Sequence, residues 1–295
     1  DKLAQLAPEK KYTLETLVRR AKAKYFTNAY TVRLAMLKSP LQKSYNNTIF
    51  GCSALLYQTG KTITSTYCNN RWCVVCNRIR TAKQIIGYKK PLSELKEKYF
   101  VTLTIPNVDK EILRAEIQQM IKNFQLIKKS FAKSKTKFIG IRKLECTYNP
   151  ILKNYHPHFH LIVNGKENAD RLVNEWLKRY TNAKIIAQDI RICDDNSMME
   201  LFKYFTKIIT NKAVYIEALD VIFRAMRGLR VYQPFSIQKV TEDIDEIEKQ
   251  IIEDLIEAEK TWEWIENDWV YTPDGECLTG YTPDEQMVYF VQNIK

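Results

Sequence analysis

The sequence has few histidines, no long apolar run and no complete phosphate-binding loop. Its 295 residues include three histidines, and no apolar stretch approaches the roughly 18 residues that a membrane-spanning helix requires. No signal peptide is evident either, so we expect an intracellular, cytoplasmic protein with no membrane partner. The segment TGKT at residues 59–62 lacks the earlier glycine of a phosphate-binding loop because position 55 is leucine, which excludes an ATPase of that type.

Charged residues are abundant but unevenly distributed. Residues 241–295 contain 16 acidic and three basic residues, a net charge of −13, whereas residues 1–240 contain 18 acidic and 43 basic residues, a net charge of +25. The high positive charge of residues 1–240 predicts a polyanionic partner. The aromatic residues interleaved with the Lys and Arg of this region can stack on unpaired bases. We therefore expect a nucleic-acid-binding protein, with scattered solubilising lysines as the alternative.

Hydrophobic periodicity predicts an α+β protein built around an antiparallel sheet. The expected helices are residues 10–38, 108–134, 168–181, about 196–210, 213–227 and an acidic helix at 241–268. The expected strands are residues 98–106, 137–150, 156–165 and 183–193. The second and third of these strands should form a hairpin with its turn near residues 149–155.

Four of the seven cysteines are clustered. Cys52, Cys68, Cys73 and Cys76 have the spacing C-x15-C-x4-C-x2-C, and clustered cysteines in an intracellular protein indicate a metal site. Four thiolates satisfy tetrahedral Zn²⁺ and leave no open position, so we expect a structural zinc. The alternative is that Cys73 and Cys76 are small buried residues or a redox pair.

Other residues near and beyond this cluster have simpler interpretations. Arg71, Arg78 and Arg80 are suited to contact DNA phosphates. The isolated Cys146, Cys193 and Cys277 are expected to be packed side chains.

All three histidines lie in the segment NYHPHFHLIV, at positions 156, 158 and 160. On a strand, His156, His158 and His160 point the same way with successive Cα atoms about 6.5 Å apart, so two imidazoles can converge on one metal ion. The predicted hairpin brings Glu145 opposite them as a third ligand. Such a set leaves positions open for substrate oxygen; a solvent-exposed strand residue is the alternative for Glu145.

These motifs resemble those of HUH endonucleases, and in particular the replication initiators (Rep proteins) of rolling-circle plasmids. HPHFH resembles the family's His-hydrophobic-His motif, YFVTLTIPN its first motif, and ELFKYFTK at 200–207 its third motif, with the cysteine cluster preceding them in family order. The resemblance covers roughly residues 50–235. It implies Mg²⁺ or Mn²⁺ at the histidines, and a nucleophilic Tyr204 that forms a 5′-phosphotyrosine and frees a 3′-OH for a host polymerase.

The third motif also has a physical interpretation. Glu200, Lys203, Tyr204 and Lys207 share one face if residues 196–210 are helical. A tyrosine hydroxyl has a pKa near 10, so Lys203 and Lys207 can stabilise the phenolate and the scissile phosphate. The resemblance implies that Glu200 assists strand closure at termination, whereas the sequence SMME also fits a capping box that begins at Ser197.

We therefore expect four regions: a helical region at 1–50, a four-cysteine zinc-binding module at 51–96, an HUH endonuclease domain at 97–240, and an acidic segment at 241–295. The expected function is a metal-dependent nickase and strand transferase that initiates rolling-circle replication at single-stranded or cruciform origin DNA. Host helicase and polymerase are expected partners, and self-association is a further expectation. A transposase with the same chemistry and a non-catalytic zinc DNA-binding regulator are the alternatives.

Overall fold

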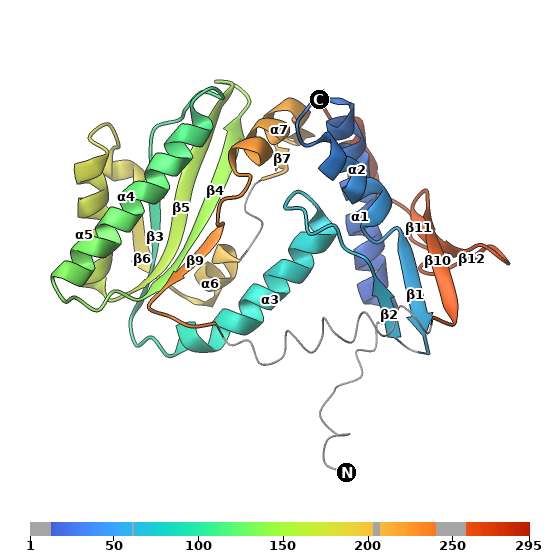
Figure 1. The fold of residues 1–295 in the computed structure, drawn as a ribbon, viewed down its shortest axis with the longest axis horizontal. Helices are drawn as coiled ribbons and strands as arrows, with labels where there is room; N and C mark the ends of the chain where they lie inside the picture. The colour runs from blue at the N-terminus through green and yellow to red at the C-terminus, as the bar shows by residue number, and fades with distance from the viewer. Residues whose placement is uncertain (1–12, 61, 203–206, 240–257) are drawn as a thin grey trace, which may run out of the picture. The chain divides into compact units, whose positions relative to one another are not determined.

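The computed structural model describes residues 13–60, 62–202, 207–239 and 258–295. The chain divides into two compact units, one made of residues 1–79 and 242–295 and the other of residues 80–241 (Figure 1). None of the helices that the structure describes is both long and apolar enough to span a bilayer.

The first unit combines helices with a five-stranded antiparallel sheet of order β12-β11-β10-β1-β2. Its elements are α1 (Leu14–Met36), α2 (Gln42–Gly51), β1 (Leu55–Thr59), β2 (Thr62–Ser65), the start of α3 (Val74–Ser93), β10 (Lys260–Ile265), β11 (Asp268–Tyr271), β12 (Glu276–Cys277) and α9 (Glu285–Gln292). Helix α1 begins at the N-cap Thr13, whose side chain accepts a hydrogen bond from the Thr16 amide. Its apolar residues Leu17 and Ala21 pack in one core cluster with Trp262 and Trp269.

The C-terminal segment differs from the sequence prediction. Residues 260–265 and 268–271 are strands, so the helix predicted for 241–268 is wrong over this part; residues 241–257 lie outside the described residues. The alternation in KTWEWI buries Trp262 between more exposed neighbours, and β10 pairs with β1 from the other end of the chain. Cys277, expected to be packed, is exposed.

Strands β1 and β2 are not among the elements expected from the sequence. They form a hairpin in which Thr59 pairs with Thr62, and Gly60 adopts a positive φ of 56° in the turn. Thr59, Gly60 and Thr62 of the TGKT segment are therefore part of a β-hairpin.

The second unit has an antiparallel sheet of order β6-β3-β5-β4-β9. Its elements are the rest of α3, β3 (Lys98–Thr104), α4 (Leu113–Lys133), β4 (Gly140–Asn149), β5 (Asn154–Asn164), α5 (Lys166–Arg179), a 3₁₀ turn η1 (Ile185–Ala187), β6 (Asp189–Ile192), α6 (Asp195–Leu201), β7 (Ile209–Thr210), β8 (Ala213–Val214), α7 (Ile216–Ala225) and β9 (Tyr232–Phe235). The α+β class, the antiparallel sheet and the β4–β5 hairpin are confirmed.

Helices cover the two faces of this sheet differently (Figure 1). On one face, Phe124 of α4 and Trp176 of α5 pack against Phe159 of β5. On the opposite face, α3 and α6 contribute Tyr88, Leu92, Met198, Leu201 and Phe202 to a cluster with Phe100, Ile141 and Ile162 of the sheet. We call this second face the site face, because it also carries the three histidines.

Helix α6 is shorter than predicted. It begins after the N-cap Asp194, whose carboxylate accepts a hydrogen bond from the Ser197 amide at 2.7 Å, and it ends at Leu201. The capping box predicted to begin at Ser197 is therefore wrong, because the helix starts one turn earlier. The predicted continuation to residue 210 is wrong at its end, where Ile209–Thr210 pairs with Ala213–Val214. Residues 203–206 lie outside the described residues.

Candidate active site and metal centres

The β4–β5 hairpin positions the first group of candidate ligands. Its register pairs Glu145 with His158 and Lys143 with His160. Because side chains alternate along a strand, these four side chains all project from the site face. The packed core of that face ends two residues along each strand, at Ile141 and Ile162. The hairpin therefore sets three potential ligands and one lysine beside the apolar cluster.

Glu145, His158 and His160 converge on one point. Glu145 Oε2 lies 3.3 Å from His158 Nε2 and 3.6 Å from His160 Nε2, and each residue offers one ligand atom within 4.8 Å of the others. Adjacent ligand atoms around a six-coordinate ion with bonds near 2.1 Å are about 3 Å apart. These three residues could therefore hold a metal ion.

Hydrogen bonds to the outer ring nitrogens orient both imidazoles. His158 Nδ1 lies 3.0 Å from the His156 carbonyl oxygen, which can only accept, so Nδ1 carries the proton and Nε2 of the neutral ring keeps its lone pair. His160 Nδ1 lies 3.1 Å from Thr102 Oγ1, which can accept in the same way. A carboxylate oxygen and two such lone pairs repel one another unless a cation lies between them, so the donor set fits a metal ion.

Lys143 compensates the charge of Glu145 from the other side. The Lys143 side chain is fully buried and forms an ion pair with Glu145 Oε1. The other carboxylate oxygen, Oε2, faces the histidines. Burial alone would raise the pKa of the Glu145 carboxyl. When a proton occupies Nε2 of each ring in the place a metal ion would take, the hydrogen bonds from His158 and His160, together with the charge of Lys143, hold that pKa well below its usual range. Glu145 is therefore ionised at neutral pH.

His156 lies beside the three converging residues and not among them. Its ring stacks on that of His158 with the centroids 4.9 Å apart. Burial, followed by the charges of His158 and His160, lowers the pKa of His156 to about 4. The structure thus gives His156 a neutral ring and a carbonyl that fixes the orientation of His158.

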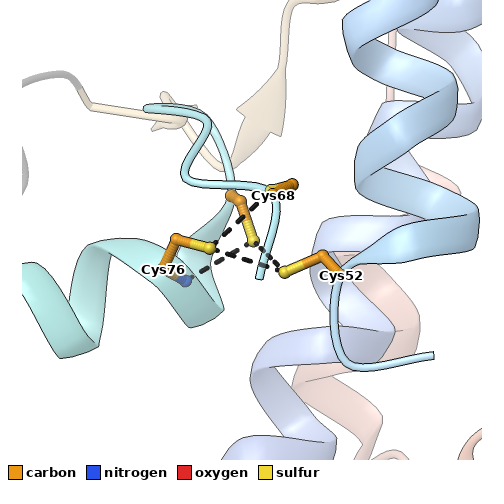
Figure 2. A group of neighbouring side chains, drawn as sticks. Cys52, Cys68 and Cys76 are labelled. Atoms are coloured by element: carbon orange, nitrogen blue, oxygen red, sulfur yellow. Dashed lines mark hydrogen bonds between the residues drawn. The ribbon is translucent and has the colours of Figure 1, made fainter. Parts of the chain in front are cut away.

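The four clustered cysteines also come together, in the first unit; Figure 2 labels three of them, Cys52, Cys68 and Cys76. Cys52 Sγ lies 3.5 Å from Cys73 Sγ and 3.4 Å from Cys76 Sγ, and Cys68 Sγ lies 3.7 Å from Cys76 Sγ. These separations are far too long for a disulfide. Tetrahedral coordination with Zn–S bonds near 2.3 Å places sulfurs about 3.8 Å apart. The cluster could therefore hold a metal ion, and its donor set fits zinc.

The residues of the third motif are only partly described. Lys203 and Tyr204 lie outside the described residues, and Lys207 is exposed and outside a helix. Glu200 lies in the last turn of α6, where its Oε2 accepts a hydrogen bond from Arg191 Nη2 at 2.7 Å. The structure places Glu200 on the helix that packs against the site face.

The three candidate DNA-binding arginines do not form one described cluster. Arg71 is half-buried, and Arg78 is exposed and donates from Nη1 to the Arg19 carbonyl at 2.8 Å. Arg80 belongs to the second unit, where burial raises the pKa of Tyr232 and the charge of Arg80 opposes that rise. Their contact with DNA stays a prediction.

Lys143 and Thr102 are not among the site residues predicted from the sequence. Strand alternation is the signal that could have identified them, because Lys143 shares a face with Glu145, and Thr102 pairs with His160 across β3 and β5. What the local sequence does not reveal is that the Lys143 ammonium is buried.

Comparison with known proteins identifies relatives. The model of a family described as "Replication protein" matches residues 60–272. The chain is 33% identical over 159 residues to "Protein rep" of Staphylococcus aureus, which covers 48% of this chain and 69% of that protein. It is 34% identical over 108 residues to "Protein rep" of Bacillus amyloliquefaciens, covering 35% of this chain and 32% of that protein. A "Protein rep" of Streptococcus pneumoniae is 29% identical over 163 residues, half of each chain. No solved structure matches.

Proposed function

Because the chain belongs to the family of rolling-circle replication proteins, we propose that it nicks plasmid origin DNA through a covalent phosphotyrosine and transfers the strand. The observation that carries this proposal is the convergence of Glu145, His158 and His160 on the site face. Single-stranded or cruciform origin DNA would be the substrate, with host helicase and polymerase acting on the nicked product. The second unit would carry this nuclease chemistry.

In the proposed reaction, the Tyr204 hydroxyl loses its proton to solvent and the resulting phenolate oxygen attacks the scissile phosphorus. The new Tyr–O–P bond forms as the bond from phosphorus to the 3′ oxygen breaks, and the leaving oxygen takes a proton to become the 3′-OH. Mg²⁺ or Mn²⁺, held by Glu145, His158 and His160, would polarise a phosphate oxygen. Lys203 and Lys207 would stabilise the phenolate, and Arg71, Arg78 and Arg80 would contact the DNA backbone.

The packing of the preceding residues supports Tyr204 as the nucleophile. Leu201 and Phe202 belong to the cluster on the site face, and the Phe202 ring lies 5.9 Å from that of Tyr232. The Lys143 ammonium lies over the Tyr232 ring, with Nζ 6.0 Å from the ring centroid. Tyr204 follows Phe202 by two residues, a span of at most about 7 Å of chain.

The cysteine cluster would serve a structural purpose. Four thiolates on one Zn²⁺ leave no open coordination position for chemistry. The ion would connect the end of α2 to the start of α3, and its binding free energy would add to the stability of the first unit.

A nicking assay on single-stranded origin DNA with Mn²⁺ tests this function. A labelled oligonucleotide that becomes covalently attached to the protein, with a free 3′-OH on the other product, supports it. Specific DNA binding without cleavage or adduct would contradict it and favour the non-catalytic regulator.

Glu200→Gln separates the beginning of the proposed cycle from its end. The amide keeps the side-chain shape but cannot take a proton, so the final hydrolysis and release should slow by at least about tenfold. Initial nicking should be nearly unchanged, because the exposed pair with Arg191 contributes little to stability, within about 1 kcal/mol. Single-turnover measurement of both steps checks this, with the exposed Glu167→Gln on α5 as control. Wild-type release by Glu200→Gln would show that Glu200 has no part in termination.

A further inference from the structure

A lysine is buried beside the cysteine cluster. Lys24 of α1 has an exposed fraction of 1%, and its neighbour Ala23 packs in one cluster with Cys52, Cys73 and Cys76. Lys24 Nζ donates to the Ile49 carbonyl at 2.8 Å, three residues before Cys52. No carboxylate lies within ion-pair distance of Lys24 among the residues that the structure describes. A buried ammonium without a carboxylate partner requires another source of negative charge.

The thiolates of the cysteine cluster would be that source. Burial lowers the pKa of Lys24, and the four cysteines act in the opposite direction as the negative charges that favour its ammonium form. Zn²⁺ with four thiolates has a net charge of −2, and three of the four cysteines are buried. Such a centre is costly to bury without a cation nearby.

Among the described residues, three neutral hydrogen-bond donors also lie against the sulfurs. The Thr48 hydroxyl and the Asn70 backbone amide each lie 3.5 Å from Cys68 Sγ, and the Cys76 backbone amide lies 3.5 Å from Cys73 Sγ. These neutral donors polarise the sulfurs, but the net charge of the centre stays at −2. Lys24 supplies a full positive charge on the α1 side.

We propose that Lys24 is the counter-cation of a tetrathiolate zinc centre, a positioning residue that retains the ion and protects its thiolates from electrophiles. This inference rests on the proposed zinc site. It goes beyond that site because it assigns α1, which provides no ligand, a part in holding the metal. Removing the charge should make the bound thiolates more nucleophilic, since less positive charge then opposes their attack.

The test is zinc release from the full-length protein during alkylation with N-ethylmaleimide, followed with a zinc-sensitive dye. Lys24→Met keeps the length and apolar character of the side chain and removes its charge. We expect it to release zinc at least about tenfold faster than the wild type. The matched control is Lys22→Met on the same helix; Lys22 is exposed and paired with Asp284, so solvent screens its charge and release should not change.

The outcomes distinguish the inference from the site on which it rests. Wild-type protein without zinc would refute the zinc site itself, whereas zinc in the wild type and an unchanged release rate in Lys24→Met would overturn only the role of Lys24. A lysine that merely binds the end of α2 through Ile49 would change thermal stability but not thiolate reactivity. If Lys24→Met is not recovered folded, Lys24→Arg replaces it in the test. A wild-type rate of zinc release from Lys24→Arg would support the role of the positive charge, and loss of zinc from it would overturn the proposal.

Discussion

The double substitution His158→Ala/His160→Ala is expected to abolish nicking, by about 10³-fold or more, while origin binding stays largely intact. It removes two of the three converging ligand atoms and leaves Glu145 paired with Lys143. Because the backbone pairing of β4 with β5 does not depend on the imidazoles, the sheet should still form. Mn²⁺ binding by calorimetry, nicking of labelled origin DNA and DNA affinity, measured on the same preparation, separate loss of the metal from loss of the fold.

The control for this variant removes two charged side chains far from the site face. Glu167→Ala/Asp170→Ala alters α5, which packs on the opposite face of the sheet, and should nick like the wild type. Full nicking by the histidine variant, or wild-type Mn²⁺ affinity, would refute the metal site.

The sequence predicts the arrangement of the hairpin because strand alternation and turn position are local properties. Once residues 137–163 are interpreted as two strands with a turn near Asn149, Glu145 must lie opposite the histidines, and the observed register pairs it with His158. The hydrogen bond from His158 Nδ1 to the His156 carbonyl joins two residues of the same strand. The alternation along the two strands therefore predicts that Glu145 and the histidines lie together. Their affinity for a metal ion stays a prediction.

The sheet of the first unit could not be predicted in the same way. Strand β10 pairs with β1 about 200 residues earlier in the chain, with Trp262 opposite Leu56. The acidic residues before it have helical spacing, and nothing local marks where that pattern changes. The alternating Trp262 and Trp264 are a signal for a strand, but their positions also fit the helical pattern that precedes them.

Two buried lysines show a second limit of the sequence. Lys24 and Lys143 have exposed fractions of 1% and 0%, although lysine is among the residues least often buried without a partner. Their burial depends on negative charge that the fold brings from elsewhere, namely the cysteine cluster for Lys24 and Glu145 for Lys143. Sequence periodicity does not reveal such compensation, because it depends on contacts between distant segments.

Tyr204→Phe is expected to eliminate the covalent protein–DNA adduct and to reduce nicking by about 10⁴-fold or more. The change removes only the hydroxyl oxygen that attacks phosphorus, so folding, metal content and DNA affinity should match the wild type. Denaturing electrophoresis of the protein with a labelled origin oligonucleotide measures the adduct directly.

Tyr215→Phe provides the matched control, because Tyr215 is the next tyrosine after Tyr204. Its ring lies 5.5 Å from that of Tyr148. Tyr148 is three residues from Glu145 on β4 and therefore projects from the opposite face of the sheet. Tyr215 is thus poorly placed to attack a phosphate held at Glu145, His158 and His160, and its phenylalanine variant should keep the adduct. An adduct in Tyr204→Phe would assign the nucleophile to another tyrosine, and its loss in Tyr215→Phe alone would place the reaction on the face away from the metal ligands.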